Sequence, residues 1–168
     1  MKKIHAKSIV AILTRETGLR DEIVESLQSH LGAADFIGKW HPFEHTSYYA
    51  PEMGDHLQRC IVSFEGPINP DQIGKIKSWT REIEDRFRIE GKRRVNIDPG
   101  YLDYHKVILA SCKGGGHMIL LGNDVYVDML LWYNKGWQPL PWAYPDFHDG
   151  TYFEDLEEIR KIFKTQLP

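Results

Sequence analysis

The sequence has 168 residues, of which 42% are hydrophobic, 27% charged and 12% aromatic, and its formal net charge is −3. A chain of this length is typical of one domain and can bury a core without a metal or a disulfide, so we expect a single domain over residues 1–168. The negative net charge provides no general attraction for nucleic acid, which argues against nucleic acid as a partner.

The first third of the chain predicts two strands, a helix and a long loop. The apolar run Ser8–Thr14 indicates a strand buried on both faces. This run is too short for a signal peptide or a membrane span, so the sequence predicts a cytoplasmic protein without a membrane partner. Apolar residues recur every four positions from Leu19 to Leu31 and indicate an amphipathic helix. A strand and a structured loop are expected over 36–54.

The middle of the chain predicts a strand, a helix and a turn. Alternating polar and apolar residues indicate a strand over Leu57–Phe64. The segment Asn69–Gln72 offers a capping residue, a proline in the first turn and a glutamine three residues after the cap. It therefore predicts the start of a helix, which Gly91 ends. A short strand, Arg94–Ile97, then leads into a turn over Asn96–Tyr101 (N-I-D-P-G-Y).

Glycine-containing turns divide the last third of the chain into short strands, as in an antiparallel meander. The strands are expected over Val107–Cys112, His117–Leu121, Val125–Tyr133 and Trp137–Leu140. A capping box at Thr151–Glu154 begins a final helix that extends to Leu167. The predicted fold class is therefore α+β, with a ferredoxin-like βαββαβ order extended by a C-terminal antiparallel β-meander and a final helix.

The two cysteines, Cys60 and Cys112, both lie inside apolar runs. They lack the C-x-x-C spacing of a zinc or redox site, and such residues are ordinarily reduced and buried. We therefore expect two buried free thiols, and the sequence identifies neither a metal nor a cofactor.

The loop His45–Gly54 is the first candidate site. It holds two adjacent tyrosines, Tyr48 and Tyr49, close to His45 and Glu52. In one interpretation the rings pack beneath a long loop and Glu52 is solvated. In the other, a tyrosine orients a ligand while Glu52 or His45 accepts a proton.

The segment around Asp98 is the second candidate site. Asn96 and Asp98 are two residues apart, so on an extended chain their side chains point to the same side. Pro99-Gly100 is a turn signal. Asp98 either bonds the amides of its own turn or, together with Asn96, faces a ligand from a rigid strand end. We expect the preceding basic run, Lys92–Arg94, to be solvated rather than to form an anion site.

Three polar residues of the expected meander form the third candidate site. Asp128 lies in mid-strand, where a carboxylate is unfavourable unless it faces water or a site. His117 opens the neighbouring strand and Lys113 ends the one before. Together they form either a water-facing polar surface or an acid–base or metal-binding group. The glycines 114–116 are expected to form a hairpin turn or, alternatively, to contact a phosphate.

Four segments of the chain occur together in one protein family. They are T-S-Y-Y-A-P-E-M-G (Thr46–Gly54), R-R-V-N-I-D-P-G-Y-L (Arg93–Leu102), K-V-I-L-A-S-C-K (Lys106–Lys113) and W-A-Y-P-D (Trp142–Asp146). With these segments the chain resembles domain of unknown function 4416, a family of bacterial proteins. The resemblance covers nearly the whole chain, from about Ile9 to Leu167. It implies a shared fold and a shared site but no particular reaction.

Two residues depart from the family pattern. Met118 stands where the family has a basic residue, and Asp128 stands where it has glutamate. If that glutamate acts as a base or a ligand in the family, the shorter side chain of Asp128 reaches less far.

The leading functional hypothesis is a protein that binds a small anionic or phosphorylated ligand and can act as a hydrolase-type enzyme with acid–base or metal-assisted chemistry. The expected catalytic residues are Glu52, Asp98, His117 and Asp128. The expected ligand-binding residues are Tyr48, Tyr49, Asn96, Lys106, Lys113 and Tyr126. The alternative is a non-catalytic binding or scaffold module that uses an aromatic loop surface with Trp137, Trp142 and Tyr144. A concave site that gathers Glu52, Asp98 and His117 would favour the enzyme.

Overall fold

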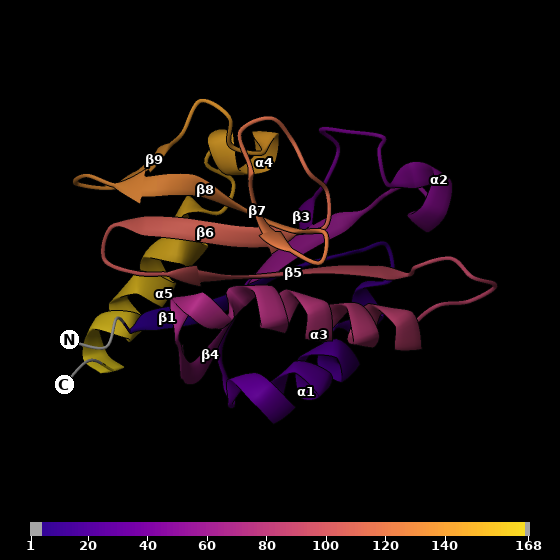
Figure 1. The fold of residues 1–168 in the computed structure, drawn as a ribbon, viewed down its shortest axis with the longest axis horizontal. Coiled ribbons are helices and arrows are strands. Elements are labelled where there is room, and N and C mark those ends of the chain that lie inside the picture. The colour runs from indigo at the N-terminus through magenta and orange to yellow at the C-terminus, as the bar shows by residue number, and fades with distance from the viewer. Residues whose placement is uncertain (1–4, 167–168) are drawn as a thin grey trace.

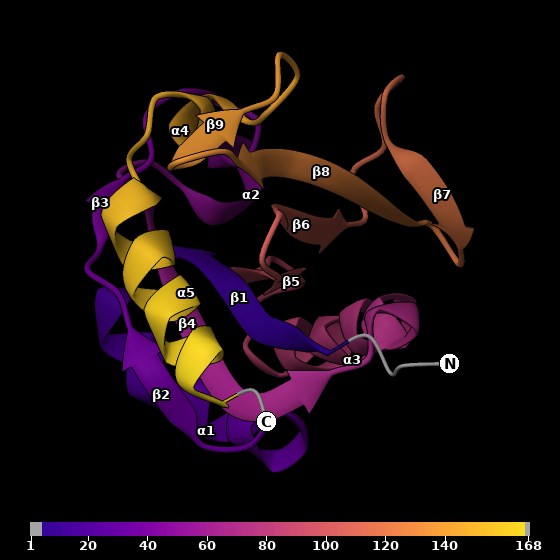
Figure 2. The ribbon, with the colours of Figure 1, turned by 90° about the vertical axis from the view of Figure 1, so that its left-hand side faces the viewer.

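The computed structural model describes residues 5–166 and consists of one sheet with helices on both faces (Figure 1, Figure 2). The strands are β1 (Ala6–Thr14), β2 (Ala34–Ile37), β3 (His41–Pro42), β4 (Gln58–Ile68), β5 (Val95–Leu102), β6 (Lys106–Ser111), β7 (Ile119–Gly122), β8 (Val125–Tyr133) and β9 (Trp137–Pro139). The helices are α1 (Arg20–Leu31), α2 (Ala50–Met53), α3 (Ile73–Arg86), α4 (Pro145–His148) and α5 (Phe153–Gln166). No helix within residues 5–166 is long and apolar enough to cross a membrane. Leu167, which was expected in the last helix, lies outside the described residues.

The nine strands form an antiparallel sheet with the order β2-β4-β1-β5-β6-β8-β7, in which β3 also pairs with β4 and β9 with β8. The predicted α+β class is confirmed. The predicted meander is wrong in one respect, because β8 lies between β6 and β7. Residues 123–124 do turn the chain from β7 into β8. The glycines 114–116 instead carry the chain from β6 to an edge strand, β7, with which β6 does not pair, so they form no hairpin.

Strand β1 is buried on both faces, as its continuous apolar run predicts. Ile9 and Ala11 pack into the core beneath α5, whereas Val10 and Ile12 pack into the core beneath α1 and α3. Figure 2 shows these helices on opposite sides of the sheet. Each large apolar side chain buried in this way contributes about 1.5–3 kcal/mol. Because successive side chains of β1 point to opposite faces of the sheet, this strand packs against the helices on both sides of it.

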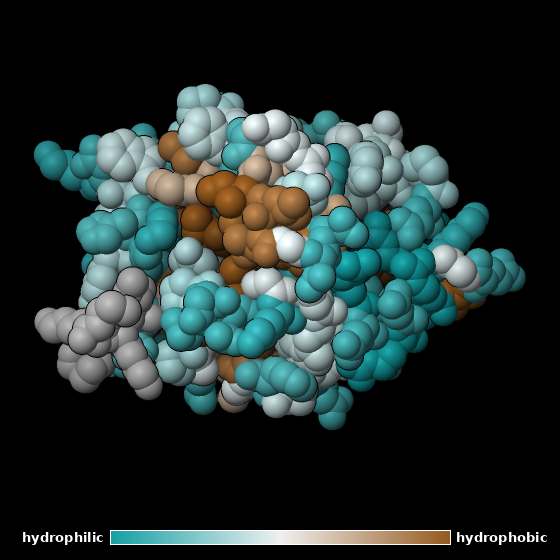
Figure 3. All heavy atoms as spheres, viewed as in Figure 1, coloured by the Kyte–Doolittle hydropathy of each residue, from teal (hydrophilic) through white to brown (hydrophobic). Residues whose placement is uncertain are grey.

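Strand β7 forms the edge of the sheet opposite β2 and is exposed along its whole length. Ile119, Leu120 and Leu121 are 66%, 58% and 49% exposed. An apolar patch is visible in Figure 3 where Figure 1 places β7 in front of the sheet. These side chains form the most exposed apolar run in the described part of the chain.

The segment Asn96–Tyr101 is not a turn, so that prediction is wrong. It lies within β5, which pairs with β1 residue by residue along its whole length. On its other side, β5 pairs with β6 only through residues 100–102, and the two strands separate before Gly100. The backbone N–H and C=O groups of successive residues in a strand point alternately to its two sides. Pro99, which has no N–H, therefore faces the side on which β5 has separated from β6. The proline therefore interrupts no ladder.

The thiols differ in their surroundings. Cys60 is buried in the core, whereas Cys112 is exposed. The prediction of a buried thiol is therefore wrong for Cys112. The reason is that β6 ends at Ser111, so the next side chain lies beyond the paired strand.

Gly100 stands where β5 and β6 come together. A Cβ atom at this position would lie 2.1 Å from the carbonyl oxygen of Ile108 and 2.6 Å from a methyl carbon of Leu109. Such distances are far below van der Waals contact. The close approach of two strands, rather than a turn, therefore requires glycine here.

We predict that Gly100→Ala lowers the free energy of unfolding by about 1–3 kcal/mol, because the added methyl group forces β5 and β6 apart. Urea denaturation measures the change. Gly116→Ala is the matched control, since an added Cβ there meets no atom within 4 Å, and it should shift stability by less than about 0.5 kcal/mol. Equal stability of the two variants would contradict the close approach.

Candidate functional site

The separation of β5 from β6 leaves the backbone N–H and C=O of Ile97 without a strand partner on the side that faces β6. Two side chains of α3 take the place of that strand. Lys77 donates from Nζ to the carbonyl oxygen of Ile97 at 2.6 Å, and the N–H of Ile97 donates to Oε1 of Glu84 at 2.7 Å. Buried backbone groups are unfavourable without such partners. Helix α3 therefore completes the sheet at the point where it splits.

Lys77 also neutralises buried carboxylates. Its Nζ donates to Oδ1 of Asp98 at 3.0 Å and lies 3.3 Å from Oε1 of Glu84, and the three side chains are 2%, 5% and 5% exposed. Burial by itself would lower the pKa of Lys77, but the carboxylates of Asp98 and Glu84 outweigh burial and raise it. The ammonium group therefore stays charged inside the protein.

A chain of hydrogen bonds leads from Asp98 to α2. Asn96 donates from Nδ2 to Oδ2 of Asp98 at 2.8 Å, so the two side chains do lie on the same side of the strand. Arg93 donates from Nη1 to Oδ1 of Asn96 at 3.0 Å. It also holds both oxygens of Glu52, at 2.9 and 2.8 Å. These bonds from Arg93 keep the pKa of Glu52 below its usual value, although burial opposes the shift.

The basic run Lys92–Arg94 is solvated only in part. Lys92 is exposed, as expected. Arg93 binds Glu52, and Arg94 donates from Nε to Glu16 at 2.9 Å. The expectation of a solvated run is therefore wrong for both arginines, because carboxylates distant in sequence reach them.

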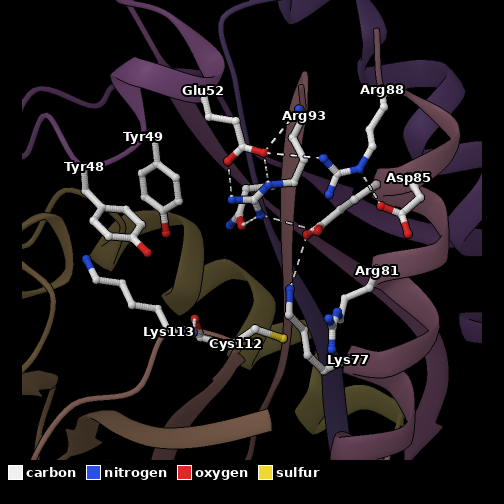
Figure 4. Close-up of a pocket in the computed structure, with 13 residues that line it drawn as sticks. Tyr48, Tyr49, Glu52, Lys77, Arg81, Asp85, Arg88, Arg93, Cys112 and Lys113 are labelled. Carbon is white, nitrogen blue, oxygen red and sulfur yellow. Dashed lines mark hydrogen bonds and ion pairs between the residues drawn. The ribbon is translucent and has the colours of Figure 1, made fainter. Parts of the chain in front are cut away.

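A pocket of about 390 Å³ lies in the split between β5 and β6 (Figure 4). It is surrounded by the α2 segment, by helix α3 with the start of β5, and by the end of β6. Its lining residues are Tyr48, Tyr49, Glu52, Lys77, Arg81, Glu84, Asp85, Arg88, Arg93, Asn96, Ser111, Cys112 and Lys113. Figure 4 shows Lys113 and the two tyrosines across the pocket from Arg81 and Arg88.

Basic side chains outnumber carboxylates in the pocket. The basic ones are Lys77, Arg81, Arg88, Arg93 and Lys113, and the acidic ones are Glu52, Glu84 and Asp85. Asp85 is held by Arg88 at 2.6 Å. Among residues 5–166, neither Arg81 nor Lys113 forms an ion pair. Lys113 instead lies over the ring of Tyr48, with Nζ 3.7 Å from the ring centre.

The structure brings six of the ten site residues predicted from sequence to the pocket or into contact with its lining. Tyr48, Tyr49, Glu52, Asn96 and Lys113 line the pocket, and Asp98 joins it through its bonds to Lys77 and Asn96. Two others lie elsewhere. Lys106 pairs with Asp103 at the far end of β6, and the ring of Tyr126 packs behind Gly114 of the β6–β7 loop.

His117 and Asp128 form a separate pair. Nε2 of His117 lies 3.2 Å from Oδ2 of Asp128, and Trp142 stacks on the imidazole with ring centres 6.0 Å apart. Asp128 is only 2% exposed in its side chain, so it does not face water. Burial raises the pKa of Asp128, although His117 opposes the shift. Neither residue lines the pocket, so Glu52, Asp98 and His117 do not form one concave site.

Sequence reasoning missed the contribution of α3. Lys77, Arg81 and Glu84 follow one another at spacings of four and three residues, which places them on one face of a helix. Lys77 and Glu84 both occur beside apolar positions of that helix, and both are buried. A pair of opposite charges seven residues apart next to an apolar stripe was the available signal.

The carboxylates of the pocket are already bound by basic side chains. Glu52 binds Arg93, Asp85 binds Arg88, and Glu84 binds Lys77. No group of three or more His, Cys, Asp or Glu residues in the described range could hold a metal ion. The arrangement is therefore suited to an anion, which basic side chains attract, rather than to a cation.

We predict that Lys77→Met destabilises the protein by about 3–5 kcal/mol, because Asp98 and Glu84 would be left as uncompensated buried charges. Urea denaturation at pH 7 measures the loss. Lys75→Met, on an exposed position of the same helix, is the control and should change stability by less than about 0.5 kcal/mol. A Lys77→Met protein as stable as the control would show that the lysine is not needed in the split.

We predict that Asp128→Asn stabilises the protein at pH 7. Burial raises the pKa of Asp128 in the folded state, so its ionisation costs the native protein free energy as pH rises through that pKa. Asparagine avoids this cost, and the difference should shrink toward pH 3, where the carboxyl is protonated in both states. Urea denaturation at the two pH values measures both differences.

Asp35→Asn provides the opposite control. Burial would raise the pKa of Asp35, but hydrogen bonds from Lys7, Ser63 and Gln166 outweigh burial and lower it. The ionised carboxylate thus contributes stability that is lost as pH falls through its folded-state pKa. Asp35→Asn should therefore destabilise the protein at pH 7 and have less effect near pH 3. If Asp128→Asn and Asp35→Asn changed the free energy of unfolding at pH 7 in the same direction, the opposite pKa shifts assigned to these two carboxyl groups would be contradicted.

Comparison with known proteins places the chain in a family. A family model described as "Domain of unknown function (DUF4416)" matches residues 4–163. No curated protein and no solved structure gave a match. The match covers nearly the whole chain and includes every residue of the pocket. The chain belongs to the DUF4416 family.

Proposed function

We propose that the pocket between β5 and β6 binds a small anion, such as a phosphate or carboxylate group. The observation that carries the proposal is the surplus of basic side chains, two of which, Arg81 and Lys113, have no ion-pair partner within residues 5–166. They approach the pocket from opposite sides (Figure 4). Lys77, Arg88 and Arg93 are neutralised by carboxylates, and their bonds fix the walls of the pocket. Charge-assisted bonds of this kind are the strong ones for phosphate and carboxylate.

Binding has more support than hydrolysis. Glu52 and Asp98, two of the predicted catalytic residues, are each held by a basic side chain. The bonds from Arg93 lower the pKa of Glu52, which makes this carboxylate a weaker base. His117 and Asp128 pair with each other outside the pocket lining. We therefore propose a binding protein and assign no reaction to these residues.

A ferredoxin-like arrangement explains how the pocket arises. We infer that β1, α1, β2, β4, α3 and β5 form such a unit, since the strand order is β2-β4-β1-β5 and both helices pack on one face. The segment with β3 and α2 is then an insertion between two strands of the unit. This insertion brings Tyr48, Tyr49 and Glu52 to the pocket. The arrangement itself has no bearing on the ligand.

A scaffold module with an aromatic surface has weaker support. Tyr48 and Trp142 are 55% and 43% exposed. However, Trp137 is buried, and Trp142 is fixed by a hydrogen bond from Nε1 to the carbonyl oxygen of Met129. The aromatic residues therefore do not form the shared surface that this alternative requires.

We predict that inorganic phosphate binds saturably and that Arg81→Ala and Lys113→Ala each weaken binding about tenfold, because each removes a charge-assisted bond. Chemical-shift titration of backbone amides measures the affinities. Arg86→Ala, on α3 outside the pocket lining, is the control for charge and should leave the affinity unchanged.

Two results would contradict the proposal. One is the absence of saturable phosphate binding to the native protein. The other is an equal effect of Arg81→Ala and Arg86→Ala, which would indicate a nonspecific response to net charge.

A further inference from the structure

A second cavity adjoins the anion pocket. It has a volume of about 140 Å³ and shares three lining residues, Tyr49, Ser111 and Lys113, with the larger pocket. The same three side chains therefore stand between the two spaces. A ligand held by Lys113 can extend past Tyr49 into the second cavity.

The second cavity has apolar walls. Phe43, Tyr49, Tyr144 and Pro145 contribute rings to its lining. Planar rings are favoured in such surroundings, because aromatic side chains present flat apolar surfaces. The chemistry of this cavity thus differs from that of the basic pocket beside it.

Two of the charged residues of the second cavity, Arg59 and Asp146, neutralise each other. Arg59 and Asp146 form a buried ion pair, with side chains 3% and 1% exposed. Tyr152 donates a further hydrogen bond to Asp146 at 2.8 Å. The pair therefore adds no net charge, and an uncharged group suits the end of the cavity away from Lys113.

The hydroxyl group of Tyr49 has no protein partner. Tyr49 is 8% exposed, and its hydroxyl forms no hydrogen bond with any residue in the described range. Figure 4 shows this hydroxyl directed from α2 into the pocket. Burial raises the pKa of Tyr49, so the group is a protonated donor. This hydroxyl is not among the fully buried unpaired atoms of residues 5–166, so water reaches it, and an acceptor atom of a ligand can take the place of that water.

The two ends of the combined space differ in charge. The Tyr144 end holds the neutralised Arg59–Asp146 pair. The Lys113 end adjoins the surplus of basic side chains. A ligand in both spaces must place its negative group beside Lys113 and its uncharged part beside Tyr144.

We propose that the two cavities form one site for a compound that joins an anionic group to a planar, uncharged ring. This inference rests on the proposed function, since the anionic group is the one assigned to the basic pocket. The ring lies between Phe43, Tyr49 and Tyr144 and accepts a hydrogen bond from the Tyr49 hydroxyl. The anionic group lies between Lys113 and Arg81.

Two probes that differ only in the ring test the inference. Inorganic phosphate carries the anionic group alone, and phenyl phosphate adds a planar ring. We expect phenyl phosphate to bind about tenfold or more tightly, because the ring is removed from water. Chemical-shift titration of the full chain gives both affinities. The amides around Phe43 and Tyr144 should shift only with phenyl phosphate.

A variant that fills the second cavity locates the ring. Thr46 lines the cavity from an exposed loop position, so Thr46→Trp should reduce the affinity ratio of the two probes toward one. Ser47→Trp places the same side chain on the next residue, which lies outside the lining of either cavity, and should leave the ratio unchanged.

The outcomes separate this inference from the proposed function. Equal affinity for the two probes overturns the ring site and leaves anion binding intact. An equal effect of Thr46→Trp and Ser47→Trp also overturns it, because the ring then binds elsewhere. If neither probe binds, the proposed function fails and the inference fails with it.

Discussion

The insertion of Lys77 into the split sheet is the interaction on which the candidate site depends. β5 follows β1 along its whole length but meets β6 only at one end. The lysine and Glu84 bond the backbone of Ile97 where a strand would otherwise do so. A sheet that divides in this way exposes polar groups in its interior, and they are stable only because α3 provides charged partners. The pocket and the charged side chains that line it thus both arise from the separation of β5 from β6.

The pocket combines fixed and unpaired charges. Arg93 is bound to Glu52 and Asn96, and it connects α2 to β5. Lys113 and Arg81, by contrast, have no ion-pair partner in the described part of the chain. Residues of the first kind set the shape of the pocket, whereas those of the second kind are the side chains assigned to the proposed anion. This division is what a preformed binding site requires.

Local patterns predicted most elements but not the central feature of the sheet. The buried strand β1, the amphipathic helix α1 and the strand β8 follow from apolar periodicity. The dipeptide Pro99-Gly100 was misinterpreted because proline followed by glycine is also typical of a turn. Here the proline lies where the strand needs no hydrogen bond, and the glycine lies where a neighbouring strand comes close. The contribution of α3 to the pocket depends on contacts between Lys77 and a strand twenty residues later, which periodicity does not encode.

The edge formed by β7 has a consequence for the handling of the protein at high concentration. Its three large apolar side chains accompany backbone groups beyond which no strand of residues 5–166 lies. Such edges favour intermolecular strand pairing, and a strand of four residues limits but does not abolish this tendency. The net charge of −3 gives little repulsion between molecules, and added salt screens even that. Colloidal stability should therefore decrease as ionic strength rises, with β7 as the point of self-association.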